Sequence, residues 1–214
     1  REMADSGRMK ARIRASLYDS PDWDDTDVAF GQGDDLARIV GWKIVTDGSN
    51  QGFTGRQRQP YVGTDSVGIF YVEPETLKEK VATRAAQGWP VVMHGNGDAA
   101  IDSILDATEA AKDAGIEVES LRFRIEHCSI LHDDQIRRIK ALGMTPSFLI
   151  NHVYYWGHAM RDDVFGPEKV RLLDRCAAVE RASVRILVRR CPRPGPYRDR
   201  ESIGLVNIFL ILGF

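Results

Sequence analysis

The chain has 214 residues, of which 43% are hydrophobic and 28% are charged, and its formal net charge is −2. This length is enough for one sizeable hydrophobic core and favours a single folded domain. The near-zero charge argues against nucleic acid or a charged membrane surface as a partner. Three cysteines without motif spacing argue against a disulfide framework, so we expect a reducing, cytoplasmic compartment.

Strand-like and helix-like segments alternate along the chain. The hydrophobic pattern predicts strands over residues 13–18, 39–45, 89–94, 121–127, 144–151 and 183–188, and helices over residues 75–87, 99–114, 133–142 and 168–181. The glycine-rich segment 47–68 is long for a plain connection, which is typical of functional loops. The alternation indicates an α/β fold with a parallel sheet, and both a barrel and an open doubly wound sheet fit it.

A histidine ends each of two successive predicted strands: His94 ends one and His127 ends the next. Neighbouring parallel strands lie about 4.8 Å apart, so both imidazole rings can reach one metal ion at a distance of about 2.1 Å. The alternative for each histidine is a buried ring that is hydrogen-bonded to backbone. The two residues alone leave both interpretations open.

Three further residues are candidates for the same site. Lys43 lies in the apolar middle of a predicted strand. It is either a snorkelling lysine or, once its amine is carboxylated by carbon dioxide, an oxygen ligand to a metal. His152 and Trp156 belong to an aromatic cluster at the end of the strand predicted over 144–151. This cluster can wall a substrate pocket or cover the rim of the sheet.

Residues 95–100 read G-N-G-D-A-A, which has the form G-x-G-x-x-A of a dinucleotide-binding turn. A glycine-rich turn that ends with Asp98 as a helix cap explains the pattern equally well. Glu117 and Glu119 have about the right offset for a ribose-binding acid but precede the next strand, whereas Glu126 lies too far along the chain. An NAD-binding oxidoreductase is therefore the rival of a metal-dependent hydrolase.

Three segments, in order, carry a resemblance to a known family. Residues 43–54 resemble its K-x-x-x-DGS-x-x-x-x-T segment, residues 94–100 its H-x-x-GD-x-A segment, and residues 124–127 its R-I-E-H segment. The chain thus resembles amidohydrolase family 3 of the metal-dependent amidohydrolase superfamily, in the branch that includes N-substituted formamide deformylase.

This resemblance implies a TIM (β/α)₈ barrel and a divalent metal, usually zinc. It implies that His94 and His127 match the histidines after strands 5 and 6 of the family, and that Lys43 matches the lysine of strand 4. The implied reaction is hydrolysis of a non-peptide carbon–nitrogen bond in a small amide or formamide substrate, by a metal-bound water that attacks the carbonyl. The expected substrate pocket consists of Asp47, Ser49, His152 and Trp156. Asp98 is expected to support the site by capping its helix.

The sequence departs from the family pattern near both ends. The His-x-His pair of strand 1 and the aspartate after strand 8, a metal ligand and proton shuttle in the superfamily, are missing from the expected places. From residue 181 an arginine- and proline-rich stretch follows, as in a frameshifted end. We therefore expect residues 1–182 to form an incomplete barrel without the N-terminal strands and the accessory β domain, and residues 183–214 to be a divergent tail.

The apolar run over residues 203–212 is too short to span a bilayer, which needs about 20 residues.

The departures from the family pattern bear on activity and assembly. Exposed strand edges in an incomplete barrel favour aggregation or a homo-oligomer. Because the ligand set is short and the proton shuttle is missing, we expect a truncated hydrolase that is weakly active or inactive. The alternative from another class is a non-catalytic remnant or interaction protein.

Overall fold

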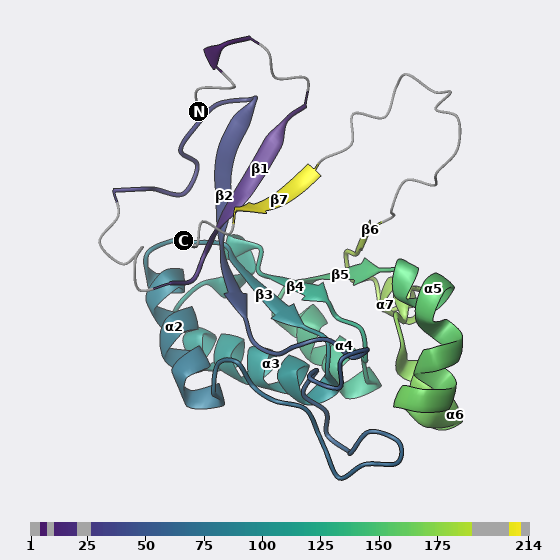
Figure 1. Ribbon diagram of the computed structural model, residues 1–214. Helices are drawn as coiled ribbons and strands as arrows, with labels where there is room; N and C mark the ends of the chain where they lie inside the picture. Colours follow the sequence, from purple (N-terminus) through teal and green to yellow (C-terminus); the bar gives the residue numbers. More distant parts are fainter. Residues whose placement is uncertain (1–4, 8–10, 21–26, 190–205, 211–214) are drawn as a thin grey trace. The chain divides into compact units, whose positions relative to one another are not determined.

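The structure, a computed structural model, describes residues 5–7, 11–20, 27–189 and 206–210 (Figure 1). The chain divides into two compact units, of which the first contains residues 1–43 and 192–214 and the second contains residues 44–191. Within the described residues, the structure has no helix that is both long and apolar enough to cross a membrane. The predicted tail lies largely outside the described residues.

The first unit contains parallel strands. β1 (Ile13–Tyr18) pairs on one side with β2 (Ala37–Val45), which runs on into the second unit, and on the other side with β7 (Val206–Leu210). The indole Nε1 of Trp42 donates a hydrogen bond of 2.8 Å to the carboxylate of Asp19, which directly follows β1. This bond ties the end of β1 to its neighbour.

The second unit contains four further parallel strands that pair in chain order: β3 (Val91–Gly95), β4 (Arg124–His127), β5 (Thr145–Leu149) and β6 (Leu187–Arg189). Parallel pairing requires a crossover between strands, and helices provide it here. The predicted α/β class with a parallel sheet is therefore confirmed.

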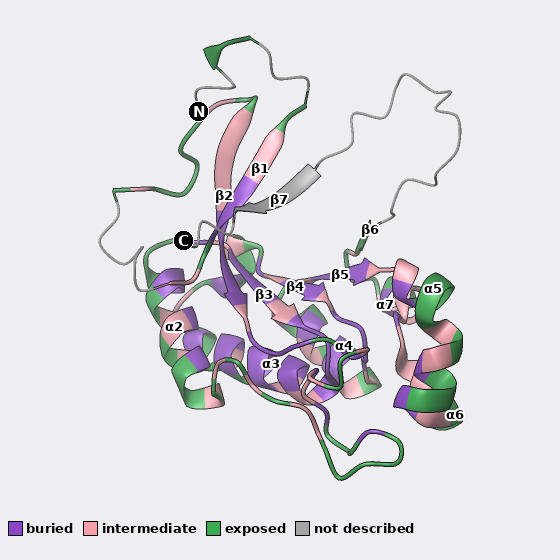
Figure 2. Ribbon diagram, viewed as in Figure 1, coloured by how far each residue is buried: buried purple, intermediate pink, exposed green. Residues whose placement is uncertain are grey.

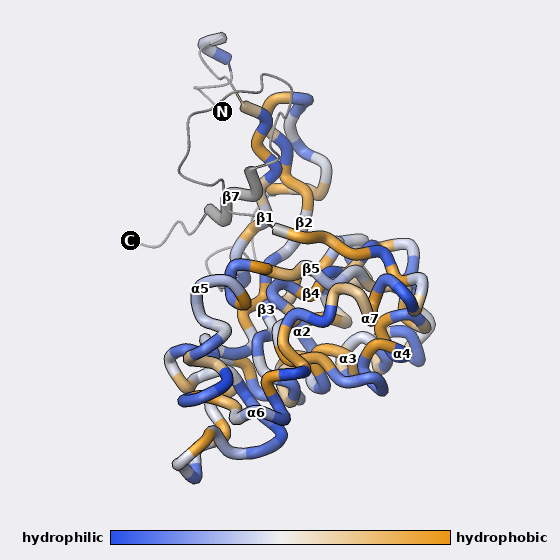
Figure 3. The backbone as a smooth tube through the Cα atoms, turned by 90° about the vertical axis from the view of Figure 1, so that its right-hand side faces the viewer, coloured by the Kyte–Doolittle hydropathy of each residue, from blue (hydrophilic) through white to orange (hydrophobic). Residues whose placement is uncertain are grey.

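The helical elements of the second unit are α2 (Pro74–Ala86), α3 (Asp98–Asp113), η2 (Val118–Leu121), α4 (Asp133–Ala141), α5 (Asn151–Ala159), η3 (Met160–Val164), α6 (Gly166–Lys169), η4 (Val170–Leu172) and α7 (Cys176–Arg181). α2 begins at Pro74, whose fixed φ suits a first helical turn. Hydrophobic and hydrophilic residues alternate along α3 and α4, as expected for helices with one buried face (Figure 3).

The core of this unit lies where α3 packs on the strands (Figure 2). Ile101 and Ile104 of α3 are fully buried, as are Met93 of β3 and Ile125 of β4. Gly95 permits close packing of α3 on β3, because an added Cβ atom there would lie 2.8 Å from Cδ1 of Ile104. The face of β3 that contains Gly95 is therefore the helix-packed face.

Four predicted elements differ in extent from the structure. The strand predicted over 121–127 begins at Arg124, because η2 runs through Leu121, and the strand predicted over 183–188 is the shorter β6. The strand predicted over 144–151 ends at Leu149, where its pairing with β6 also ends, and the chain turns directly into α5. The single helix predicted over 168–181 is divided, because Leu173 leaves the helical path to form a bridge with Ile130. Asp174 follows with a left-handed φ of 44° and donates its backbone N–H to the carbonyl of Ser129. Tertiary pairing with this segment overrides the local helical preference.

Asp174 is also a buried carboxylic acid with an exposed fraction of 6%. Among the described residues, neither of its carboxyl oxygens has a hydrogen-bond partner. Burial raises the pKa of this group to about 8, because a carboxylate without partners is poorly solvated inside a protein. At neutral pH the folded chain therefore holds Asp174 in its protonated form.

We expect Asp174 to make the folded state less stable as the pH rises from about 4 to about 8. The unfolded residue ionises near its usual pKa of about 3.9 while the folded residue stays protonated, which removes about 1.4 kcal/mol of unfolding free energy per pH unit. An Asp174→Asn variant should lack this loss. Its unfolding free energy in urea should exceed that of the wild type at pH 8 and be similar near pH 4.

The exposed Asp113→Asn variant, at the end of α3, is the matched control and should follow the wild-type pH profile. Identical profiles for the wild type and Asp174→Asn would contradict the raised pKa.

Candidate functional site

His94 and His127 lie close together at the carboxyl ends of adjacent strands. His94 is the penultimate residue of β3 and His127 is the last residue of β4. Their ring centroids are 4.5 Å apart and the ring planes meet at 65°. Both residues are partly exposed. The structure therefore brings together the two histidines that the sequence singled out as metal ligands.

This convergence depends on an unusual backbone conformation. The strand register pairs His127 with Gly95, which is on the helix-packed face, and pairs Glu126 with His94. Regular alternation would therefore turn the His127 ring towards the helices and away from His94. Instead, His127 and Cys128 both have left-handed φ values, of 69° and 49°. The left-handed φ at His127 swings its Cβ out of the regular alternation and lets its ring meet that of His94.

A left-handed non-glycine residue costs on the order of 1–3 kcal/mol, so the surrounding structure must hold these two in place. The N–H of Cys128 donates to the carbonyl of Gly95 at 2.9 Å, and the N–H of Ile130 donates to the carbonyl of Asn96 at 3.2 Å. Both bonds tie the turn after β4 to the end of β3. Strain of this kind often occurs at functional sites.

Asp47 supports His94 from the glycine-rich loop. Its buried carboxylate accepts backbone N–H bonds from Arg56 at 2.9 Å, Asn96 at 3.0 Å and Gly97 at 2.8 Å. This clamp places the carbonyl of Gly48 at 3.2 Å from Nε2 of His94. Because the Asp47 side chain has no exposed surface, it supports the site and does not form the pocket wall that we predicted.

Ser49 is exposed on the same loop, and its Oγ accepts the N–H of Gly52 at 3.1 Å. Trp156 lies on α5 with 47% of its surface exposed. Neither position closes a pocket by itself, and the roles of both residues in substrate binding stay predictions.

A chain of side-chain contacts links His94 to a third imidazole. Nδ2 of Asn96 lies 3.0 Å from Nε2 of His94, and Oδ1 of Asn96 accepts a bond of 2.8 Å from the hydroxyl of Ser129. The same hydroxyl oxygen lies 3.2 Å from Nδ1 of His152, whose ring centroid is 5.6 Å from that of His127. Burial lowers the pKa of His152, which favours the neutral ring.

Asn96 and Ser129 were missed as site residues, because nothing in their local sequence distinguishes them from ordinary turn residues. His152 was predicted at a strand end but is the second residue of α5. Its proximity to His127 results from the turn between β5 and α5.

Asp98 holds several segments around the site. It is the first residue of α3, and Gly97 occupies the N-cap position that we had predicted for Asp98. Its buried carboxylate accepts the backbone N–H of Arg58 at 2.7 Å and lies 3.0 Å from Nε2 of His132 and 3.2 Å from Nζ of Lys169. These contacts are those of a structural support.

The turn at residues 95–100 does not have the free helix end that a dinucleotide needs. The carbonyl oxygen of Arg56 accepts the backbone N–H groups of Ala99 and Ala100 at the start of α3. An added Cβ on Gly97 would lie 1.9 Å from the same oxygen. The protein's own backbone thus occupies the position of a pyrophosphate, and the rival prediction of an NAD-binding turn is wrong.

The residues at this site fit part of a metal-binding set. A metal-ligating histidine is usually held in place through its other ring nitrogen, and Nε2 of His94 lies 3.2 Å from the Gly48 carbonyl and 3.0 Å from Nδ2 of Asn96. Two imidazoles supply half of the four ligands that zinc usually takes. In the part of the chain that the structure describes, three or more His, Cys, Asp or Glu residues are nowhere grouped in a way that could hold a metal ion.

Lys43 is buried in β2 and belongs to the first unit, whereas both histidines belong to the second. Its role as a metal ligand therefore stays a prediction.

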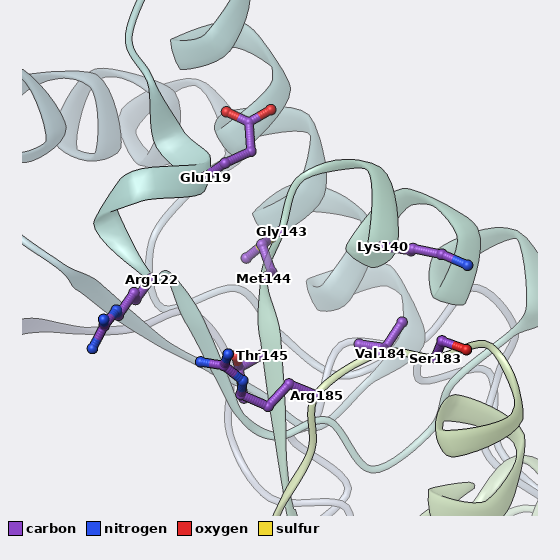
Figure 4. Close-up of a pocket in the computed structure, with 9 residues that line it drawn as sticks. All are labelled: Glu119, Arg122, Lys140, Gly143, Met144, Thr145, Ser183, Val184 and Arg185. Atoms are coloured by element: carbon purple, nitrogen blue, oxygen red, sulfur yellow. The ribbon is translucent and has the colours of Figure 1, made fainter.

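A cavity of about 340 Å³ lies at the opposite end of the strands (Figure 4). It is bordered by Thr145 at the start of β5 and by three cationic residues, Arg122, Lys140 and Arg185. Arg122 and Lys140 are at or near the ends of η2 and α4, where cations offset the partial negative charge of helix carboxyl ends. Figure 4 shows the Arg122 and Lys140 side chains pointing away from each other. The positions of Arg122 and Lys140 are explained by the helix ends, and their charged groups do not point towards a common ligand position.

Comparison with known proteins agrees with the fold. The sequence profile of the amidohydrolase family matches residues 1–190. The chain therefore belongs to amidohydrolase family 3. A search of curated proteins found no significant match.

Two solved structures are similar to this chain, and each is described as an uncharacterized metal-dependent hydrolase. The one from Pyrococcus furiosus is 25% identical with a TM-score of 0.73, over 87% of this chain and 38% of its own. The one from Pyrococcus horikoshii OT3 is 25% identical with a TM-score of 0.72, over 87% of this chain and 37% of its own. The chain thus spans less than two fifths of their length, and the predicted incomplete TIM barrel is confirmed.

We expect an Asp47→Asn variant to lose about 2–3 kcal/mol of unfolding free energy. The amide nitrogen that replaces one carboxylate oxygen would face a backbone N–H donor and leave it without an acceptor. Urea unfolding followed by circular dichroism measures the loss. Asp65→Asn, at an exposed position of the same loop, is the control and should change stability by less than about 0.5 kcal/mol. Equal effects of both variants would contradict the clamp.

Proposed function

We propose that this chain is the part of a metal-dependent amidohydrolase that supplies two histidine ligands to a divalent metal. The reaction is hydrolysis of a non-peptide carbon–nitrogen bond in a small amide or formamide, as in the branch that includes N-substituted formamide deformylase. Zn²⁺ is the metal that two imidazoles at strand ends suit best. The cysteine usage supports a cytoplasmic location.

The observation that carries this proposal is the pair of imidazoles with centroids 4.5 Å apart at adjacent strand ends. A pair of rings that served only packing would not need two consecutive left-handed residues to meet. The support from Asp47 and Gly48 adds a second observation, because it directs Nε2 of His94 towards a carbonyl.

The parts of the site have separate roles in this proposal. His94 and His127 would hold the ion, and Lys43 is proposed as a further ligand. The bound ion would lower the pKa of a water molecule and polarise the carbonyl group of the substrate. Ser49, which is exposed on the glycine-rich loop, and Trp156, which is exposed on α5, are proposed to contact the substrate. The rest of a complete ligand set would have to come from residues other than this pair.

Metal binding tests the proposal directly. Untagged protein is loaded with Zn²⁺, dialysed, and measured by elemental analysis. The wild type should retain zinc, and His94→Ala and His127→Ala should each weaken its binding by at least about tenfold, since even the loss of a residue behind a metal ligand costs that much.

His158→Ala is the matched control, because His158 is an exposed histidine on α5, and it should bind zinc like the wild type. Zinc retention that is unchanged in His94→Ala would contradict the proposal. A wild type that retains no zinc would favour the alternative of a non-catalytic remnant or interaction protein.

We expect the 214-residue chain to show little or no turnover of N-formyl or N-acyl amines when it is supplied with zinc. Two imidazoles leave the ion with an incomplete set of protein ligands, and no third His, Cys, Asp or Glu among the described residues is grouped with them. Release of the amine, followed by chromatography, measures the activity. Clear turnover that disappears in His127→Ala would show that this expectation is wrong and that the pair suffices.

A further inference from the structure

The buried polar path from His94 to His152 determines more than the position of the two rings. Its two middle members, Asn96 and Ser129, have exposed fractions of 3% and 0%, and His152 has 7%. Water is therefore largely excluded, and each hydrogen atom on the path must have an acceptor within the protein. The proton positions can be worked out by counting donors and acceptors.

The orientation of the Asn96 amide follows from the loop. One side of the amide group lies 2.8 Å from the carbonyl oxygen of Gly48, which can only accept a hydrogen bond. This side must therefore be the nitrogen, Nδ2. The oxygen, Oδ1, then lies on the other side, 2.8 Å from the hydroxyl of Ser129.

The orientation of Asn96 decides the role of Ser129. Because Oδ1 of Asn96 can only accept, the one hydrogen of the Ser129 hydroxyl points to it. The hydroxyl oxygen can then only accept from its second neighbour, Nδ1 of His152, at 3.2 Å. Nδ1 of His152 must therefore carry the proton, and Nε2 is the unprotonated nitrogen of the neutral ring.

We propose that Asn96 and Ser129 are positioning residues that hold His152 in its Nδ1–H tautomer, so that Nε2 presents a lone pair to a ligand bound among the clustered imidazoles. This tautomer is the opposite of the one that histidine favours in water. The role of His152 as an acceptor for a bound ligand rests on the proposed function, whereas the tautomer itself does not. His152 would then contribute a hydrogen-bond acceptor to the site beside the two metal ligands.

Nuclear magnetic resonance of protein labelled with ¹⁵N-histidine tests the tautomer without metal or substrate. Long-range ¹H–¹⁵N correlation spectra are recorded at pH 8, and the His152 signals are assigned by their loss in His152→Gln. The wild type should show a protonated Nδ1 and an unprotonated Nε2. In Asn96→Ala the Ser129 hydroxyl is free to donate to Nδ1, which should shift the tautomer ratio roughly tenfold towards Nε2–H, the effect of one hydrogen bond.

Two further variants separate positioning from a general loss of structure. Asn96→Asp keeps an acceptor oxygen for Ser129, so in contrast to Asn96→Ala it should keep the wild-type tautomer of His152. Ser129→Ala removes the acceptor for Nδ1 and should shift the ratio as Asn96→Ala does. Ser103→Ala, a buried serine of α3, is the matched control and should leave the His152 signals unchanged.

A wild-type His152 in the Nε2–H form would overturn the proposal. So would an Asn96→Ala or Ser129→Ala variant that folds and keeps the Nδ1–H form. Because the spectra contain no metal, these outcomes are independent of zinc retention by His94 and His127. A correct tautomer together with no zinc retention would overturn the proposed function and the ligand-binding role, and would leave the assignment of Asn96 and Ser129 intact.

Discussion

A single buried carboxylate organises the whole candidate site. Asp47 accepts three backbone N–H groups, one from its own loop and two from the turn after β3. Hydrogen bonds from backbone to an ionised carboxylate are among the stronger ones in proteins, and here they hold a long loop against a strand end. The Gly48 carbonyl, the Asn96 amide and the start of α3 all take their positions from this clamp.

The second constraint is the left-handed backbone at His127 and Cys128. It costs free energy, and the hydrogen bonds of Cys128 and Ile130 to the end of β3 offset part of that cost. The same turn carries Ser129 into contact with Asn96 and His152. One local distortion therefore accounts both for the meeting of His94 with His127 and for the polar path to the third ring.

The sequence-based predictions succeeded where local interactions determine the structure, and they failed where contacts between segments distant in sequence determine it. The strand and helix order was confirmed, because hydrophobic periodicity is a local property. The proximity of His94 and His127 was predicted from their positions at strand ends, yet the regular alternation of strand side chains would have separated them. The helix predicted through Leu173 and the strand predicted through residue 151 were wrong, since in both cases a pairing partner distant in sequence determined the conformation.

The sequence by itself determined the α/β class and the family segments, and it singled out His94, His127 and His152, because these depend on residue types at fixed spacing. Only the tertiary structure decided that Asp47 is a buried clamp, that the carbonyl of Arg56 excludes a dinucleotide from the start of α3, and that Asn96 and Ser129 join His94 to His152. Each of these depends on which backbone groups of distant segments meet. Such contacts cannot be predicted from the local sequence, because the same residue types also occur in turns that do not make them.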